Sequence, residues 1–157
     1  DLGKWVGGGG QLKLAASAEF VERSDALPAF QTAYGFKLKP EQILTLAGGD
    51  TAATIRAAAE KTSGVNAAMA YGTDGPVAAL GLVIMDDPKG VQPIYAPAPI
   101  VRAEVLDKNP KIKTILEPVF KALDTTTLQT LNAKIQIEGQ DAKKVAGDFL
   151  KSKGLIK

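Results

Sequence analysis

Short apolar runs that alternate with helical patterns constrain the fold of this chain more than any other feature. Each run is only about four or five residues long and is followed by turn residues, which is typical of buried strands. The runs that we expect to form strands are residues 12–16, 43–47, 66–70 and 82–85. Because helical patterns separate these runs, the sequence predicts an α/β fold with a mainly parallel sheet flanked by helices.

Residues that commonly cap helices support this alternation. Ser24 or Asp25 is expected to start the first helix, and Asp50 or Thr51 is expected to start an alanine-rich helix after the second strand. A short helical turn is predicted after Asp74, where glycine and proline follow. Each predicted strand therefore leads into a loop and the amino end of a helix.

The character of the sequence changes after Gly90. Closely spaced prolines suit a segment that crosses between two lobes, and residues 100–105 alternate apolar and polar side chains as a half-exposed strand would. Amphipathic helices are then expected to start at Asn109, Asp124 and Asp141. The predicted organisation is a flexible lead-in at residues 1–10, an α/β ligand-binding lobe at 11–98, and a crossover strand with C-terminal helices at 99–157.

The composition excludes several classes of function. The chain has no histidine and no cysteine, which removes imidazole acid–base chemistry, cysteine nucleophiles, thiolate zinc sites and disulfides. Its 19 basic and 17 acidic residues give a formal net charge of +2, too small a field to favour nucleic acid. No run approaches the roughly 20 apolar residues of a membrane span. We expect no cofactor and no metal ion, and a partner that is a small molecule or a protein.

Polar and aromatic side chains follow the predicted strands at the ends where a parallel sheet binds its ligands. The candidate ligand-binding residues are Ser17, Glu19, Arg23, Tyr71, Thr73 and Tyr95. Two tyrosine rings present faces to a cation, whereas Arg23 and the amino ends of helices favour a carboxylate. A zwitterion that carries a quaternary ammonium suits both halves of this set.

Several segments match a known family in order along the chain. They are residues 18–25, 71–75, 93–95 and 101–102, and in the tail 131–132, 145–146 and 149–150. In these segments the chain resembles the substrate-binding proteins of ABC importers for osmoprotectants such as glycine betaine and choline. Residues 49–55 and 65–69 are most similar to the osmotically induced, YehZ/OsmF-like branch. The resemblance covers nearly the whole chain, as the second lobe and the C-terminal tail of such a protein.

The resemblance implies a periplasmic-binding-protein type II fold in which two lobes close on the ligand. By motif, Arg23 would contact the ligand carboxylate, and Tyr71 and Tyr95 would be walls of a cage around a trimethylammonium group. The chain departs from the family pattern at Gly72 and Ala26, where serine and glycine are usual. The resemblance also implies a membrane permease as partner and a periplasmic or extracytoplasmic location.

Family members begin with a first lobe of roughly 100 residues that we do not find in this sequence. The C-terminal helices would normally complete that lobe, so their apolar faces would form a patch larger than soluble monomers usually expose. We therefore expect either that the tail packs on its own lobe or that two chains form a homodimer through the C-terminal helices. A self-associating scaffold fragment without tight ligand binding is the alternative function.

Simpler interpretations stay open for individual residues. The tyrosines would then be packing residues, as we expect for Tyr34, and Arg23 would be a solvated surface ion pair. Asp86 and Asp87 before a proline are interpreted as a solvated strand end rather than as metal ligands. Thr73 and Asp74 would cap the helical turn that follows them.

A third functional class is a hydrolase or lyase that uses Glu19 and Asp74 as paired carboxylates, since two acids can carry acid–base work without histidine. Nothing in their spacing favours it over binding.

Overall fold

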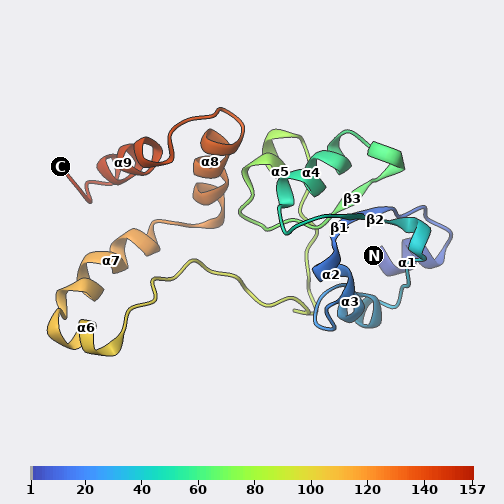
Figure 1. Ribbon diagram of the computed structural model, residues 1–157, viewed down its shortest axis with the longest axis horizontal. Coiled ribbons are helices and arrows are strands. Elements are labelled where there is room, and N and C mark those ends of the chain that lie inside the picture. The colour runs from blue at the N-terminus through green and yellow to red at the C-terminus, as the bar shows by residue number, and fades with distance from the viewer. Residues whose placement is uncertain (1) are drawn as a thin grey trace.

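A computed structural model describes residues 2–157 as a small parallel sheet with helices on both faces and a helical C-terminal tail (Figure 1). The strands are β1 (Leu14–Ser17), β2 (Ile43–Leu46) and β3 (Ala67–Ala68). The strand order is β2-β1-β3, and β1 pairs in parallel with both neighbours. The predicted α/β class with a parallel sheet is therefore confirmed.

Helices divide between the sheet and the tail. Around the sheet lie α1 (Leu2–Gly7), α2 (Ala18–Glu22), α3 (Leu27–Tyr34), α4 (Thr51–Ala59) and α5 (Gly75–Ala79). The tail comprises α6 (Ala103–Lys108), α7 (Lys111–Lys121), α8 (Thr125–Gln136) and α9 (Ala142–Ser152). Short 3-10 turns at Pro40–Gln42 and Thr62–Gly64 precede β2 and β3.

The core lies on both faces of β1, because successive side chains of a strand point to opposite faces. Leu14 and Ala16 pack with Leu27 of α3 on one face, and Ala15 packs with α4 and Val65 on the other. All four residues of β1 are buried, as expected for a central strand covered on both sides. Full burial of a side chain such as Val65 contributes about 1.5–3 kcal/mol, so these two layers hold the lobe together.

Three of the predicted helix caps are confirmed. The carboxylate of Asp50 accepts a hydrogen bond from Ala52 N at the start of α4. Asp124 and Asp141 accept in the same way from Thr127 N and Lys144 N, at the starts of α8 and α9. Each cap satisfies a backbone donor that the helix itself leaves without a partner.

The cap predicted at Ser24 or Asp25 is wrong, because α3 begins later, at Leu27, with Pro28 in its first turn. A proline is well tolerated there because it has no backbone N–H to leave unbonded. Asp25 instead pairs with Arg23, and the residues after β1 form the separate helix α2.

Two predicted strands are absent from the part of the chain that the structure describes. Residues 82–85 are irregular, with Leu82 packed on the α4 side of the core and Val83 88% exposed. Residues 103–108 form helix α6 where a half-exposed strand was expected over 100–105. An apolar run becomes a strand only where another strand offers backbone hydrogen bonds, and neither run has such a neighbour here.

The first ten residues are not a flexible lead-in throughout, since residues 2–7 form α1, while residue 1 lies outside the described part. Leu2 and Val6 pack on the core beside α3. Gly3 allows this close approach, because a Cβ atom there would lie only 1.9 Å from the carbonyl oxygen of Tyr34. The glycine-rich stretch therefore follows a short docked helix.

One helix of the tail packs directly on the lobe. Helix α8 lies against α5, and a Cβ atom added at Gly75 would lie 2.2 Å from Ala133 N. Helix α9 packs on α8, whereas α6 and α7 pack on each other and lie at the far end of the crossing segment (Figure 1). Ile115 of α7 is 64% exposed.

Candidate functional site

The structure brings all six predicted site residues to one open hollow of about 770 Å³, which we call the tyrosine hollow. They are Ser17, Glu19, Arg23, Tyr71, Thr73 and Tyr95. Ser17 ends β1, Glu19 lies on α2, and Arg23 follows that helix. Tyr71 and Thr73 come from the loop after β3, and Tyr95 lies on the irregular segment that crosses toward the tail. Neighbouring parallel strands end at the same edge of a sheet, so these loops converge although they are far apart in sequence.

Tyr71 and Tyr95 meet edge to face in the tyrosine hollow. Their ring centroids are 5.8 Å apart and the ring planes are 83° from each other. In such a pair the edge of one ring covers part of the face of the other and leaves further faces open. Both side chains are about half exposed, at 49% and 58%. The two rings thus form an accessible right-angled aromatic corner.

Asp74 fixes the backbone of Tyr71 through two hydrogen bonds. Its buried carboxylate accepts a 2.7 Å hydrogen bond from Tyr71 N, and its own N–H donates to Tyr71 O at 3.0 Å. The predicted cap of the following helix is therefore wrong in detail, because this carboxylate bonds to the turn and not to α5. Asp74 does not line the tyrosine hollow, whereas Glu19 does. The two acids proposed as a catalytic pair consequently do not share one cavity.

Helix α8 also binds the turn at residues 71–74 through two side-chain hydrogen bonds. Gln129 Nε2 donates to the carbonyl of Gly72 at 2.7 Å, and Asn132 Nδ2 donates to the carbonyl of Thr73 at 2.8 Å. These bonds satisfy backbone acceptors that a loop would otherwise leave to water. The tail therefore takes part in shaping the loop that carries Tyr71 and Thr73.

Each guanidinium nitrogen of Arg23 has a partner. Nε donates to Asp25 at 2.6 Å, Nη1 to Glu19 at 2.8 Å, and Nη2 to the hydroxyl of Tyr95 at 3.2 Å. The hydrogen bonds to Tyr95 and Asp25 raise the pKa of Arg23 further above its already high ordinary value. One positive charge thus lies beside two carboxylates, which leaves this group with a net charge of −1.

Ser17 is a buried structural residue at the floor of the hollow. Its hydroxyl oxygen accepts a hydrogen bond from Phe20 N and caps α2, and it donates to Met69 Sδ at 3.5 Å. These contacts tie the end of β1 to the residue that follows β3. Ser17 therefore positions α2, which carries Glu19 and ends at Arg23.

Among the residues of the hollow that sequence reasoning missed are Asp87 and Gln92. The interpretation of Asp87 as a solvated strand end is wrong, because its half-buried carboxylate accepts hydrogen bonds from the Tyr34 hydroxyl and from Gln92 N. Tyr34 stacks on Phe30, as a packing residue would, but its hydroxyl also bonds across to Asp87. The available signal was the Asp-Pro pair, since an aspartate there commonly accepts bonds from the backbone N–H groups that follow it.

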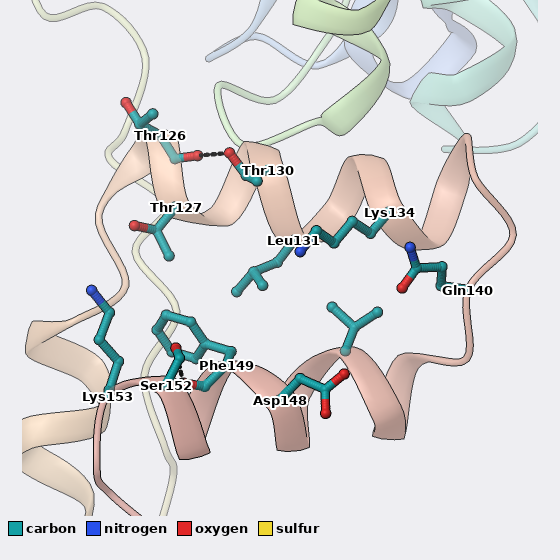
Figure 2. Close-up of a pocket in the computed structure, with 11 residues that line it drawn as sticks. Thr126, Thr127, Thr130, Leu131, Lys134, Gln140, Asp148, Phe149, Ser152 and Lys153 are labelled. Carbon is teal, nitrogen blue, oxygen red and sulfur yellow. Dashed lines mark hydrogen bonds between the residues drawn. The ribbon is translucent and has the colours of Figure 1, made fainter.

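A second hollow, of about 460 Å³, lies between α8 and α9 (Figure 2). Leu131 and Phe149 point into it from the two helices, and Thr126, Thr130 and Lys134 lie along α8. None of the six predicted site residues lines this hollow.

No group of three or more His, Cys, Asp or Glu side chains within residues 2–157 is arranged to hold a metal ion. In the same part of the chain, no helix has both the length and the apolar character needed to cross a membrane.

Comparison with known proteins identifies relatives of this lobe. The glycine betaine-binding protein YehZ of Escherichia coli (strain K12) is 67% identical over 157 residues, which are 100% of this chain and 52% of that protein. A glycine-betaine-binding protein of Pseudomonas aeruginosa is 34% identical over 142 residues, 90% of this chain and 44% of that protein. The chain thus spans about half the length of the curated relatives it matches.

Solved structures share the fold. Apo YehZ from Escherichia coli superposes with a TM-score of 0.78 at 66% identity, over 99% of this chain and 55% of that one. The crystal structure of a glycine betaine/carnitine/choline ABC transporter gives 0.74 at 26% identity, over 92% and 50%. The predicted periplasmic-binding-protein type II fold is confirmed by these neighbours.

A family model described as the substrate-binding domain of the ABC-type glycine betaine transport system matches residues 1–152, close to the full length of the chain. The chain therefore belongs to the family of substrate-binding domains of ABC-type glycine betaine transport systems.

Proposed function

We propose that this chain is a ligand-binding lobe of the solute-binding component of an ABC importer. Its ligand is a quaternary-amine or zwitterionic osmolyte of the glycine betaine or choline type, bound between this lobe and a second one. The observation that carries the proposal is the aromatic corner of Tyr71 and Tyr95, with Arg23 hydrogen-bonded to Tyr95. The names of the relatives, which include glycine betaine and choline, support the same ligand class.

The corner suits a cationic group for two reasons. A cation within about 6 Å of a tyrosine ring is attracted to the face of the ring, and two perpendicular rings offer two faces to one ligand. The charges beside it add to this attraction, because Arg23, Glu19 and Asp25 together carry −1. A trimethylammonium group, which donates no hydrogen bonds, is recognised by these features without further polar partners.

A ligand carboxylate would bind at Arg23, where it would compete with the carboxylates of Glu19 and Asp25. The two carboxylates already paired with the guanidinium are exposed, with side-chain accessibilities of 71% for Glu19 and 64% for Asp25. Exposed ion pairs typically contribute only about 0–1 kcal/mol, so a well-placed ligand carboxylate can displace one of them. Zwitterions such as glycine betaine and cations such as choline therefore both fit, with different dependence on Arg23.

The proposal extends to location and partner. As a member of this family, the lobe would work in a periplasmic or extracytoplasmic space and deliver its ligand to a membrane permease. It would act by closure around the ligand, without catalysis.

Exposed apolar side chains of the tail support the alternative function, a self-associating fragment. Ile115 of α7 and Ile137 after α8 are 64% and 49% exposed, and Ile100 is fully exposed. In this alternative two chains form a homodimer through the C-terminal helices and cover these side chains.

The test combines light-scattering mass with calorimetric titration of the same 157-residue sample with glycine betaine, choline and proline betaine. A monomer that releases or absorbs heat of binding would support the ligand-binding function in this lobe alone. A dimer that binds none of the three would support the alternative. For that case, the titration of a two-lobed chain containing this lobe decides whether the tyrosine hollow binds these ligands at all.

A further inference from the structure

Tyr95 lies on a segment that has almost no structure of its own. Residues 83–100 contain no helix or strand, and within them only Asp87, Val91 and Gln92 are partly buried. Gln92 precedes Tyr95 by only three residues, a reach of at most about 10 Å. The position of Tyr95 therefore depends on what anchors residues 87–92 to the lobe.

The anchor is a hydrogen-bonded cluster at the C-terminal end of α3. The hydroxyl of Tyr34 donates to Asp87 Oδ1, and Asp87 Oδ2 accepts from Gln92 N at 2.9 Å. Lys89 N donates to the Tyr34 hydroxyl at 3.1 Å, so this oxygen both donates and accepts. The bond from Tyr34 is the main cause of the lowered pKa of Asp87, followed by the N–H of Gln92.

Lys89 strengthens the contact with α3. Its ammonium group donates to the carbonyl of Ala33, near the end of the helix, and lies 5.1 Å from the centroid of the Tyr34 ring. A cation near the C-terminal end of a helix is favourable because the last carbonyls have no partner within the helix. Tyr34 thus contacts the turn at residues 87–92 through its ring and through its hydroxyl.

A second connection leads from the same turn to the ligand site. Gln92 Nε2 donates to the backbone carbonyl of Asp25 at 3.0 Å, and the carboxylate of Asp25 pairs with Arg23. Arg23 in turn donates to the hydroxyl of Tyr95. The turn and Tyr95 are therefore attached to the same short loop, at residues 23–25.

We propose that Tyr34 and Asp87 are positioning residues of the ligand site. Their hydrogen bond fixes the start of the crossing segment on α3 and thereby holds Tyr95 against Arg23 and Tyr71. Without this bond the segment from 87 to 95 samples more conformations, and a ligand must order it at a cost in affinity. The effect on ligand affinity rests on the proposed function, whereas the effect on the position of Tyr95 does not.

The first test reads the position of Tyr95 without any ligand. The chain contains three tyrosines, so biosynthetic labelling with 3-fluorotyrosine gives three fluorine resonances, which single Tyr→Phe variants assign. We expect Asp87→Asn to shift the resonance of Tyr95 as well as that of Tyr34. Asp86→Asn, at the exposed neighbouring aspartate, is the matched control and should leave the Tyr95 resonance at the parent position. A Tyr95 resonance unmoved in Asp87→Asn would overturn the proposal.

The second test is a double-mutant cycle on ligand affinity, measured in a form of the protein that binds glycine betaine or choline. Tyr34→Phe keeps the stacking on Phe30 and removes only the hydroxyl, and we expect it to weaken binding about three- to tenfold. The same substitution in a Tyr95→Ala background should cause no further loss, because it acts through Tyr95. An equal loss of affinity in both backgrounds would contradict the proposal that Tyr34 acts through Tyr95.

The two tests separate failure of this inference from failure of the proposed function. If no betaine or choline binds to any form, the proposed function is wrong, while the fluorine shift still decides whether Tyr34 and Asp87 position Tyr95. An unchanged unfolding midpoint in Asp87→Asn, measured alongside, shows that a shift reports on the segment and not on loss of the fold.

Discussion

The Nη2 atom of Arg23 donates a 3.2 Å hydrogen bond to the hydroxyl of Tyr95, a residue 72 positions further along the chain. This bond joins the loop after α2 to the crossing segment, where the ring of Tyr95 meets that of Tyr71 edge to face. The same guanidinium is paired with Glu19 and Asp25. Arg23 therefore links the aromatic and the charged parts of the candidate site, so we expect a substitution in either part to affect the other.

The aromatic corner gives the most direct prediction. In a form that binds a quaternary amine, Tyr71→Ala or Tyr95→Ala should each weaken the ligand by roughly 1 to 2 kcal/mol through the loss of a cation–π contact. Calorimetric titration with choline measures the loss. The Phe variants keep a ring face and serve as controls that should lose less. Ala variants that titrate like the parent would mean that the tyrosines only pack.

The ion pairs of Arg23 should tune ligand preference. Glu19→Gln removes one of the two carboxylates that compete for the guanidinium, so a ligand with a carboxylate gains relative to one without. We expect the ratio of the Kd for choline to the Kd for glycine betaine to rise by about two- to fivefold, the range typical of an exposed ion pair.

Glu19→Gln also tests the catalytic alternative: binding should persist in this variant, whereas loss of a measurable turnover would support that alternative. Glu22→Gln, on the same helix but without an ion pair to Arg23 among the described residues, is the matched control and should leave the ratio unchanged. An unchanged ratio in both variants would show that Arg23 does not meet the ligand carboxylate.

The contact between α5 and α8 depends on a glycine. A methyl group at Gly75 would lie 2.2 Å from Ala133 N and 2.5 Å from its Cα, and backbone atoms cannot move aside as a flexible side chain can. Gly75→Ala should lower the free energy of unfolding by about 1–3 kcal/mol, measured by urea denaturation.

Gly147→Ala is the matched control for that substitution. Gly147 lies inside α9, and a Cβ atom there meets nothing within 4 Å. Because alanine is a better helix former than glycine, this variant should stabilise the protein by about 0.5–1 kcal/mol. Destabilisation by both variants to the same extent would mean that the α5–α8 contact is not the cause.

Acid should weaken the start of α8. The hydrogen bond from Thr127 N is the main cause of the lowered pKa of Asp124 in the folded protein. A lowered folded pKa means that the stabilisation is fully present above the ordinary value of 3.8 and is lost as pH falls through the lower, folded value.

Thermal unfolding midpoints between about pH 2 and 6 test this expectation, in a range that brackets the ordinary aspartate pKa. Asp124→Asn keeps a capping side chain without a charge, so the difference in midpoint between the parent and this variant should shrink as the pH falls below 3.8. Asp107→Asn on α6 is the control and should show no such convergence. A difference that stays constant down to the lowest pH would contradict the capping role of the charge.

Much of the lobe could be predicted from local patterns. The buried run that forms β1, the pairing strand β2 and the caps at Asp50, Asp124 and Asp141 depend on residues that lie close together in sequence. The convergence of Ser17, Glu19, Arg23, Tyr71 and Thr73 also followed, because the ends of parallel strands meet at one edge of a sheet whatever the loops contain.

Other features were decided only by the tertiary structure, because they depend on partners distant in sequence. Residues 82–85 and 100–105 have strand-like patterns but no described strand beside them, so neither segment forms a strand. The bond from Tyr34 to Asp87, the bond from Arg23 to Tyr95 and the approach of α8 to Gly75 join segments that lie far apart in sequence. The sequence by itself determined the elements and the edge at which the site lies, and the tertiary contacts determined how its side chains are held there.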